Sequence, residues 1–249
     1  MTRQKILITG ASSGLGAGMA RAFAAKGRDL ALCARRLDRL EELKAELTTR
    51  HPGITVAIGE LDVNDHEQVP KVFAALAAEL GGLDRVVVNA GIGKGWPLGE
   101  GKLWANKATI ETNLVSALVQ IETALEMFKK SGSGHLVLIS SVLGNKGVPG
   151  LKAAYAASKA GLTSLGESLR AEYTSGPIKV TVIEPGYIES EMTAKSNSTL
   201  LMVDNQTGVD AMVKAMEREA GRAVVPTWPW LPLVTLLRRL PPRFTKPFA

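Results

Sequence analysis

Short apolar runs alternate along the chain with longer stretches of helical periodicity. The runs with the length and composition of strands are residues 5–9, 30–34, 55–59, 85–89, 135–140 and 179–184, with a shorter one at 223–225. All but the last are continuously apolar, which is typical of strands buried on both faces of a sheet. The pattern predicts an α/β protein, a single domain whose doubly wound parallel sheet of about seven strands has helices on both faces and right-handed crossovers.

The stretches of helical periodicity lie between these runs. The clearest are residues 17–26, 106–130, 152–173 and 209–219. In a doubly wound sheet the ligand binds beyond the carboxyl ends of the strands. The loops that follow the strands are therefore where functional residues are expected.

The composition is that of a folded globular chain. Its 249 residues are 45% hydrophobic and 22% charged, which excludes a disordered, collagen-like or coiled-coil protein and suffices for the core of one large domain. Cys33 is the single cysteine, and His51, His66 and His135 are scattered, so neither an internal disulfide nor a metal site is expected. Because no signal-peptide pattern and no membrane-spanning apolar stretch occurs, we expect a cytoplasmic protein.

The positive charge is concentrated at the C-terminal end. The formal net charge is +6, but five of the 30 lysines and arginines follow Glu219, the last acidic residue, which leaves 25 positive against 24 negative charges before it. A nearly neutral body offers no basic face, so no nucleic-acid partner is expected.

Residues 226–249 differ in composition from the rest, and we expect them to be a tail on a globular domain of residues 1–225. The tail holds six of the 12 prolines and two of the four tryptophans. One interpretation is a short helix over residues 233–240 at a membrane surface, with tryptophans at the headgroups and arginines on anionic lipid. The side chains concerned are Trp228, Trp230, Arg238, Arg239 and Arg243. The alternative is an arm that covers the substrate pocket or packs on a partner subunit.

The first predicted strand ends in a glycine-rich turn ahead of an alanine-rich helical stretch. Glycines allow a tight turn and a close approach of the backbone to a ligand, and free amide groups at the start of a helix bind phosphate. The turn predicts a site for the pyrophosphate of a dinucleotide, formed by Gly10, Ser12, Ser13, Gly14, Leu15 and Gly16.

Five further motifs follow this turn in order. They are Leu61-Asp62-Val63, Asn89-Ala90-Gly91-Ile92, Thr112-Asn113-Leu114, Tyr155 to Lys159, and Pro185-Gly186. Together with the turn, over residues 5 to about 193, they resemble the short-chain dehydrogenase/reductase family in its single-domain branch. The resemblance implies a Rossmann fold that binds a nicotinamide dinucleotide. It further implies cofactor contacts for Asp62, Val63, Asn89, Ala90, Gly91, Tyr155, Lys159, Pro185, Gly186, Ile188 and Ser190.

The residues after the second predicted strand bear on the choice between NAD and NADP. An NAD enzyme usually has an acid here that binds the ribose hydroxyls and repels a 2′-phosphate, but Cys33-Ala34 offers none. Arg35 and Arg36 follow instead, and a guanidinium group matches a phosphate in charge and geometry. We therefore expect NADP(H). The alternative is that both arginines pair with acids of the following helix. Cys33 itself is expected to be a small buried strand residue.

Tyr155 and Lys159 lie four residues apart and so share one face of the predicted helix 152–173. A tyrosine titrates at about pH 10, and a nearby ammonium together with an oxidised nicotinamide would lower its pKa. The resemblance implies that Tyr155 is the general acid that protonates the substrate oxygen, with Lys159 tuning it and binding the nicotinamide ribose. It also implies that Asn113 holds a water that links Lys159 to solvent. The alternative for Asn113 is an ordinary polar helix residue.

Two serines, Ser140 and Ser141, end the fifth predicted strand. The usual spacing in the family would place the catalytic serine at Val142, so one residue is inserted between this strand and Tyr155. We take Ser141 as the hydroxyl that orients the carbonyl, because the family uses the second serine of such a pair. Ser140 is the alternative.

The segment after the sixth predicted strand resembles the part of the family that covers the substrate. The backbone of Ile188 is expected near the nicotinamide carboxamide, and Ser190 stands where the family often has threonine. Residues 191–206 have no clear period and resemble a mobile cover. Its apolar residues, Met192, Leu200, Leu201 and Met202, would line a pocket, the alternative being a small core helix.

These features predict an NADPH-dependent carbonyl reductase, or the reverse alcohol dehydrogenase, for an apolar ketone or aldehyde such as a 3-oxoacyl or steroid-like compound. A reductase of small xenobiotic or sugar carbonyls is an alternative with the same chemistry. A non-catalytic NADP-binding interaction protein is the alternative from another class, and the presence of Tyr155, Lys159 and Asn113 argues against it. The resemblance also implies a homo-oligomer, a dimer or tetramer paired through the two long helices.

Overall fold

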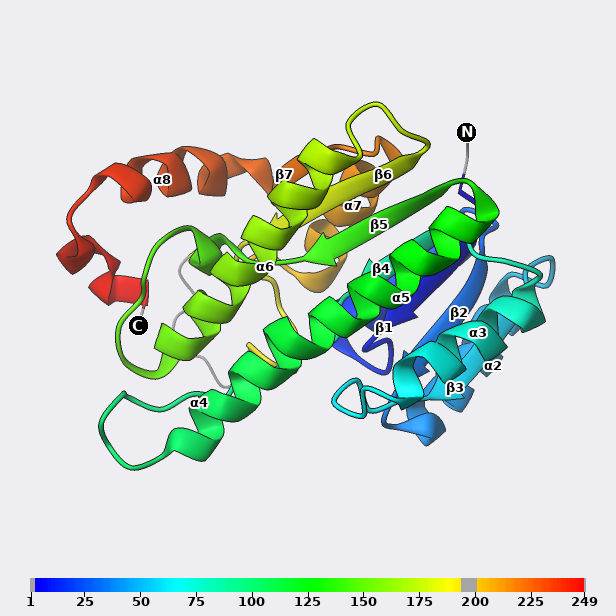
Figure 1. Ribbon diagram of the computed structural model, residues 1–249, viewed down its shortest axis with the longest axis horizontal. Coiled ribbons are helices and arrows are strands. Elements are labelled where there is room, and N and C mark those ends of the chain that lie inside the picture. The colour runs from blue at the N-terminus through cyan, green and yellow to red at the C-terminus, as the bar shows by residue number, and fades with distance from the viewer. Residues whose placement is uncertain (1–2, 194–200, 249) are drawn as a thin grey trace.

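A parallel sheet of seven strands forms the centre of the protein (Figure 1). The computed structural model describes residues 3–193 and 201–248, and in these ranges the strand order is β3-β2-β1-β4-β5-β6-β7, with every neighbouring pair parallel. The strands are β1 (Lys5–Thr9), β2 (Asp29–Ala34), β3 (Val56–Glu60), β4 (Arg85–Val88), β5 (Gly134–Ile139), β6 (Ile178–Pro185) and β7 (Arg222–Val225). The predicted α/β fold is therefore confirmed, and no strand end differs from its predicted position by more than one residue.

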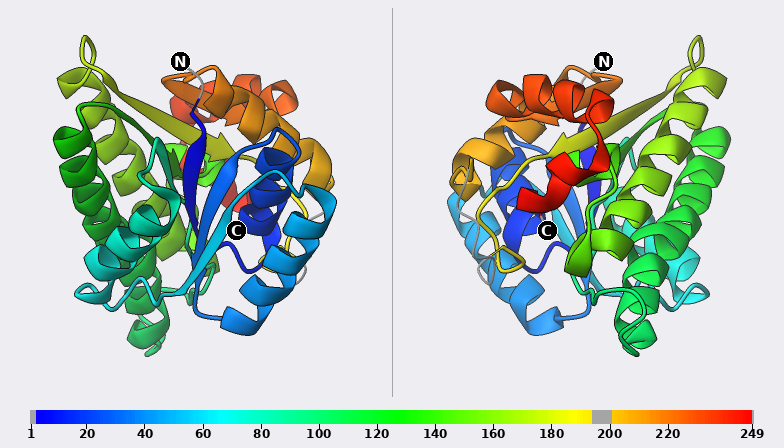
Figure 2. Two further views of the ribbon diagram at one scale, coloured as in Figure 1. Left: turned by 90° about the vertical axis from the view of Figure 1, so that its right-hand side faces the viewer. Right: turned by 90° about the vertical axis from the view of Figure 1, so that its left-hand side faces the viewer.

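Helices cover both faces of this sheet (Figure 2). One face carries α1 (Gly14–Ala24), α2 (Leu37–Arg50) and α7 (Asn205–Glu217), and the other carries α3 (Gln68–Leu80), α5 (Ser116–Ser131) and α6 (Ala153–Glu172). Each face has its own apolar core, the first around Phe23 and Met212 and the second around Phe73 and Phe128. The strand order reverses between β1 and β4, which is the point where such sheets bind ligands.

The predicted helix over residues 106–130 differs in detail from the structure. It consists of α4 (Leu103–Ile110), a π-helical turn η1 (Glu111–Val115) and α5, which follow one another in a line in Figure 1. Single π turns inside helices occur mostly at functional positions. Asn113 lies in the middle of this one.

The predicted helix over residues 17–26 also begins earlier than expected. α1 starts at Gly14, so the last three residues of the glycine-rich segment, 14–16, lie in the first turn of the helix.

The C-terminal tail folds back on the domain. Its helix α8 (Thr227–Arg239) packs beside β7 and the 3₁₀ turn η2 (Val142–Asn145), and a final 3₁₀ segment η4 (Pro242–Phe248) follows. Trp228 has non-helical backbone angles, so the continuous part of the helix starts at Pro229, earlier than the predicted residue 233. Pro229 and Pro232 both lie in its first turn, where a missing N–H costs little. Trp230 is 1% exposed, so the prediction that both tryptophans lie at a membrane surface is wrong for Trp230.

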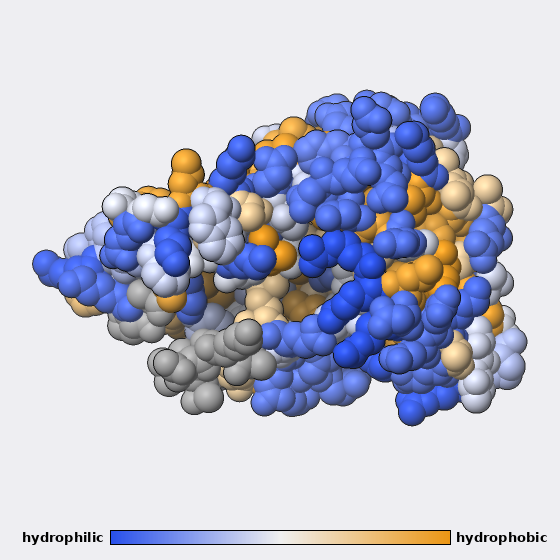
Figure 3. All heavy atoms as spheres, turned by 90° about the horizontal axis from the view of Figure 1, so that it is seen from below, coloured by the Kyte–Doolittle hydropathy of each residue, from blue (hydrophilic) through white to orange (hydrophobic). Residues whose placement is uncertain are grey.

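Hydrophilic side chains cover most of the face seen from below in Figure 3, with hydrophobic side chains showing between them. No helix in the described ranges has both the length and the apolar character needed to cross a membrane.

Candidate active site

The turn after β1 is shaped for the close approach of a ligand. Gly10 and Gly14 have φ values of +66° and +53°, which other residues rarely adopt. A Cβ at Gly16 would collide with the carbonyl oxygen of Gly10. Ser13 is the N-cap residue of α1, but its hydroxyl does not cap the helix. The first amide groups of α1 are therefore open to an anion.

Thr9 and Asn89 hold this turn against the end of β4. The Thr9 hydroxyl accepts hydrogen bonds from the backbone N–H groups of Asn89 at 3.0 Å and Ala90 at 3.1 Å. The Asn89 amide donates to the carbonyl oxygens of Thr9 at 2.8 Å and Gly10 at 3.4 Å. The side chain of Asn89, predicted as a cofactor contact, is thus bonded to the turn and braces it.

The end of β2 carries no acid. Cys33 is buried, and burial raises the pKa of its thiol to about 12, so it remains neutral. Arg35 and Arg36 follow with exposed side chains. The Arg36 guanidinium reaches back over the glycine turn and donates to Ser13 Oγ at 2.7 Å and Ser12 Oγ at 3.3 Å.

Glu191, in the loop after β6, is the acid that pairs with Arg36. Arg36 Nη2 and Glu191 Oε2 lie 3.2 Å apart, so Arg36 pairs across the site rather than with acids of α2. Hydrogen bonds from Ser13 and then from Arg36 lower the pKa of Glu191. A phosphate bound beside Arg36 would carry the same charge as Glu191, and the exposed glutamate would have to turn away.

Three further predicted cofactor positions are Asp62, Val63 and Ser190, and Ser190 is the one that lies beside this turn. Asp62 and Val63 follow β3; Val63 is buried, and Asp62 Oδ1 accepts a hydrogen bond from the backbone N–H of Asn64 at 3.0 Å. Ser190, after β6, lies beside the glycine turn, since a Cβ on Gly14 would be 3.4 Å from Ser190 Cβ.

The π turn brings Asn113 to the loop after β4. Its amide oxygen accepts a hydrogen bond from the Ile92 N–H at 2.8 Å, and its amide nitrogen donates to the Ile92 carbonyl at 2.9 Å. A Cβ on Gly91 would lie 3.1 Å from Asn113 Oδ1 and 3.6 Å from Lys159 Nζ, so these two side chains flank Gly91. Asn113 is 1% exposed and does not face solvent as an ordinary polar helix residue would.

Lys159 is buried beside Tyr155. Its ammonium lies 5.9 Å from the centroid of the Tyr155 ring and donates a 2.7 Å hydrogen bond to the carbonyl oxygen of Ile139, at the end of β5. Burial lowers the pKa of Lys159 to about 8. An ammonium has three N–H donors, and Ile139 takes one of them.

The two serines after β5 point to different sides. Ser140 donates to the carbonyl oxygen of Lys159 at 2.9 Å and shares a 2.7 Å hydrogen bond with Thr163, so its hydroxyl points into the core. Ser141 begins η2 and interacts with the phenol of Tyr155. The structure therefore brings Ser141, rather than Ser140, to the tyrosine.

Burial raises the pKa of Tyr155, and the hydrogen bond with Ser141 opposes this shift. The direction is opposite to the lowered pKa expected from Lys159, because burial has the largest effect on this phenol. The expectation also relied on the charge of an oxidised nicotinamide, which the polypeptide does not itself supply. In the polypeptide alone Tyr155 is a protonated phenol at neutral pH, the form required of a proton donor.

The loop after β6 closes the other side of the site. Pro185 ends β6, and a Cβ on Gly186 would collide with the indole nitrogen of Trp230. Ile188 is buried and pairs with Val203 in an isolated β-bridge. Tyr187 and Tyr155 pack against the same apolar cluster. Burial and then Tyr155 raise the pKa of Tyr187.

The residues expected to line an apolar pocket have different surroundings. Leu201 packs in the cluster that contains Tyr155, Tyr187 and Trp230. Met192 is 49% exposed and lies against Gly93. Met202 is partly buried, and Leu200 lies outside the described residues.

Several contacts of the site were not apparent from the sequence. Lys152 Nζ donates to the Tyr187 hydroxyl at 3.3 Å, and Trp230 meets the Tyr187 ring edge-on with centroids 5.3 Å apart. Lys152 could have been found from its spacing, because it lies three residues before Tyr155, at the start of the predicted helix 152–173. No signal in the sequence places Trp230 at the site or pairs Glu191 with Arg36.

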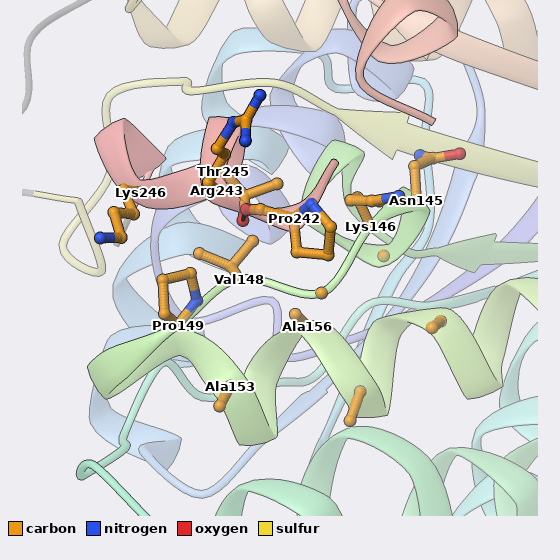
Figure 4. Close-up of a pocket in the computed structure, with 14 residues that line it drawn as sticks. Asn145, Lys146, Val148, Pro149, Ala153, Ala156, Pro242, Arg243, Thr245 and Lys246 are labelled. Atoms are coloured by element: carbon orange, nitrogen blue, oxygen red, sulfur yellow. Dashed lines mark hydrogen bonds between the residues drawn. The ribbon is translucent and has the colours of Figure 1, made fainter. Parts of the chain in front are cut away.

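A cavity of about 800 Å³ opens beside these residues, between the loop 144–149, α6 and the tail (Figure 4). Its lining is largely apolar and includes Val148, Ala153, Ala156 and Pro242, with Lys146, Arg243 and Lys246 around them. None of the predicted catalytic residues lines it. The tail therefore forms one wall of a cavity that neighbours the catalytic side chains without containing them.

The arrangement fits a nicotinamide dinucleotide. Three glycines leave a cradle without side chains beside the open amide groups of α1, and Ser12, Ser13 and Leu15 border it. Ala90 lies against Gly10 of this cradle, and the next residue, Gly91, lies beside Lys159. Within the described ranges no group of three or more His, Cys, Asp or Glu side chains is placed to hold a metal ion.

Residues 4–201 match the family described as short chain dehydrogenase. The chain therefore belongs to this family of oxidoreductases, and the resemblance seen in the order of its motifs is confirmed.

Similar proteins support the same class. A protein of Mycobacterium tuberculosis described as an uncharacterized oxidoreductase is 78% identical over 249 residues, which is 100% of this chain and 98% of that protein. An alcohol dehydrogenase from the archaeon Thermococcus sibiricus, complexed with 5-hydroxy-NADP, has a TM-score of 0.79 and 25% identity over 89% of this chain and 95% of its own.

A second solved structure has the same fold as this chain, and at its low sequence identity the similarity supports the fold only. A short-chain dehydrogenase/reductase from Burkholderia phymatum, in complex with NAD, has a TM-score of 0.82 at 19% identity over 94% of this chain and 92% of its own. The similar proteins hold an NADP-type cofactor in one case and NAD in the other, so a nicotinamide cofactor is common to both.

Proposed function

We propose that the protein reduces a ketone or aldehyde with NADPH, or carries out the reverse oxidation of an alcohol. The observation that carries this proposal is that Tyr155 meets both Ser141 and Lys159, and that Lys159 lies beside Gly91, at the carboxyl ends of β4 and β5. A protonated phenol, a hydroxyl and an ammonium at one place are suited to binding and protonating a carbonyl oxygen.

Each side chain has a distinct task in this reaction. Bound NADPH supplies the hydride. Ser141 donates a hydrogen bond to the substrate carbonyl oxygen, and Tyr155 gives that oxygen its proton. Lys159 binds the nicotinamide ribose with the N–H groups that Ile139 leaves free and stabilises the phenolate left on Tyr155.

Asn113 supports these groups from the π turn. By bonding both backbone groups of Ile92, it holds the loop that carries Gly91 beside Lys159. We propose that Tyr155 regains its proton from solvent through a water beside Asn113 and then through Lys159.

The preference for NADPH rests on Arg36. Its guanidinium lies over Ser12 and Ser13 of the glycine turn, and no acid stands at the end of β2 to repel a 2′-phosphate. Arg35 is exposed beside it and would contribute at longer range.

The apolar surroundings favour a substrate with a hydrocarbon part. Val142, Leu143 and Leu201 pack around Tyr155 together with the tail residue Trp230. The tail therefore acts as an arm over the substrate side, and substrates such as 3-oxoacyl or steroid-like compounds suit these walls.

Nucleotide binding tests the cofactor assignment. Calorimetric titration with NADPH and NADH is expected to show that the wild-type protein binds NADPH more tightly. In Arg36→Ala this preference should fall about 10-fold to 100-fold, the range for a hydrogen bond between charged groups. Arg35→Ala is the matched control and should lose less, because Arg36 is the arginine that contacts the turn. Preference for NADH in the wild-type protein, or binding of neither nucleotide, would contradict the assignment.

Turnover tests the proton donor. Tyr155→Phe keeps the ring but removes the proton, so carbonyl reduction should fall about 10²-fold to 10⁴-fold while NADPH binding persists. Unchanged activity in this variant would assign the proton to another group. A protein that binds NADPH but reduces none of a broad set of carbonyls would favour the non-catalytic alternative.

A further inference from the structure

A cation with no acidic partner among the described residues lies against Tyr187, in the loop after β6. Lys152, just before α6, is partly buried, and burial lowers the pKa of its ammonium. Among the described residues its Nζ has one hydrogen-bond partner, the Tyr187 hydroxyl at 3.3 Å. A partly buried ammonium that faces a neutral phenol is well placed to receive an anion.

Tyr187 connects Lys152 with Tyr155. The Lys152 ammonium lies 5.2 Å from the centroid of the Tyr187 ring, and Tyr187 packs against the same apolar cluster as Tyr155. Because the Tyr187 oxygen accepts from Lys152, its own proton is available for another acceptor. Lys152 and Tyr187 therefore offer two donors on the side of the cluster that also holds Tyr155.

Trp230 adds a third donor from the tail. It is 1% exposed, and its indole N–H has no hydrogen-bond partner within the described residues. The indole nitrogen lies over Gly186, and the ring meets Tyr187 edge-on. A buried donor without an acceptor is unfavourable, so an acceptor on a bound molecule is its expected partner.

We propose that Lys152, Tyr187 and Trp230 form a subsite for a negatively charged oxygen group of the substrate, and that the preferred substrates are oxo acids. The carbonyl is held at Tyr155 while the carboxylate lies at Lys152, and the hydrocarbon part lies against the apolar walls. A neutral ketone would leave the Trp230 N–H without an acceptor and the Lys152 ammonium without an anion. The inference rests on the proposed function and narrows its substrate class.

Paired ligands that differ only in this charge test the subsite. 3-Oxo-octanoate and 4-oxo-octanoate are each compared with their methyl esters, by calorimetric binding to the protein saturated with NADP⁺ and by oxidation of NADPH. The wild-type protein should bind at least one acid about 10-fold to 100-fold more tightly than its ester, as expected for a charge-assisted hydrogen bond. In Lys152→Gln this ratio should fall to about one.

Companion variants separate charge from structure. Lys152→Arg keeps the cation and should retain most of the ratio, and Tyr187→Phe should lower it partly. Lys146→Gln is the matched control, since this lysine lies beside the neighbouring cavity and bonds the Arg238 carbonyl at 3.4 Å. Lys146→Gln should leave the acid-to-ester ratio unchanged. If the ratio fell as far in Lys146→Gln as in Lys152→Gln, the acids would be responding only to the general positive charge of this region.

The binding measurement does not require turnover. If no carbonyl is reduced and no alcohol is oxidised, the proposed function fails, and the ratio of acid to ester binding still decides the subsite. Equal binding of acids and esters by the wild-type protein, or a ratio that survives Lys152→Gln, overturns the inference and leaves Lys152 as a packing partner of Tyr187.

Discussion

Among individual side chains, burial sets the protonation of the two residues that carry the proposed chemistry. Tyr155 and Lys159 are one helical turn apart, and burial shifts their pKa values in opposite directions, upward for the phenol and to about 8 for the ammonium. Both shifts favour the neutral form, as the transfer of a charge from water requires. Tyr155 therefore keeps its proton at neutral pH, and Lys159 loses its own just above it.

The pH dependence of NADPH use should show this ionisation. The kcat/KM for NADPH reports groups of the free enzyme, so it is expected to decline as the pH rises through about 8 and the Lys159 ammonium loses its charge. Lys159→Arg retains a permanent charge, and its profile, although lower, should lack this decline. Steady-state rates between about pH 6 and pH 10 make the comparison. A wild-type profile without an inflection between about pH 7 and pH 9 would contradict the assignment to Lys159.

Between elements, an ion pair joins two loops that are far apart in the sequence. Glu191 follows β6, Arg36 follows β2, and both meet Ser13 of the turn after β1. The carboxylate thus stands where a phosphate of the cofactor is proposed to bind. Binding of that phosphate would replace one anion by another on the same arginine.

Removing the charge of Glu191 should therefore favour NADPH. Glu191→Gln is expected to raise the affinity for NADPH about two-fold to five-fold, the modest range for an exposed ion pair, and to affect NADH less. Glu189→Gln is the matched control, because this exposed acid lies two residues earlier and forms no described ion pair with Arg36. Calorimetric titration measures both. A weaker affinity for NADPH in Glu191→Gln would mean that the glutamate helps to hold the cofactor.

Across the whole molecule, a buried charge network ties the sheet to α7. Arg85 of β4 is 1% exposed and pairs with Glu217 of α7 at 2.7 Å. Its Nε donates to His135 Nδ1 at 2.8 Å, and His135 Nε2 bonds the Thr181 hydroxyl at 2.8 Å. Burial and then the Arg85 charge lower the pKa of His135 well below its usual value, so this histidine is neutral.

Stability should depend strongly on Glu217. Glu217→Gln leaves the buried Arg85 without its anion, and the free energy of unfolding is expected to fall by about 3 kcal/mol. Glu46→Gln, which removes the partner of the exposed Arg21, is the control and should cost less than about 1 kcal/mol. Urea unfolding at neutral pH measures both variants. A Glu217→Gln protein as stable as the wild type would show that Arg85 finds another partner.

The same pair gives the direction of the acid dependence. Burial alone would raise the pKa of Glu217, but hydrogen bonds from Arg85 and Arg28 outweigh it and the pKa is lowered. A carboxyl with a lowered pKa contributes stability above its ordinary value of about 4, and that contribution is lost as the pH falls through the folded-state pKa. Urea unfolding below about pH 4 should therefore show a smaller difference between Glu217→Gln and the wild type.

Parts of the site could be anticipated because they depend on short spacings. The glycine turn, Asn89 to Gly91, and the Tyr155 and Lys159 pair each lie within one loop or one helical turn, where distance along the chain sets distance in space. The choice between Ser140 and Ser141 could not be made this way. Two adjacent residues at a strand end point to opposite sides, and the inserted residue removes the spacing that would have distinguished them.

The sequence by itself determined the sheet, the family and the class of cofactor. Continuous apolar runs leave buried parallel strands as their stable arrangement, and the order of the loops after those strands is the order of the motifs. Only the tertiary structure decided that Trp230 lies in the site, that Lys152 faces Tyr187 and that Glu191 pairs with Arg36. These contacts join segments that meet only after the helices have packed on the sheet, so no local pattern encodes them. The burial that shifts the pKa values of Tyr155 and Lys159 likewise exists only in the folded protein, because it is the packed chain that removes water from them.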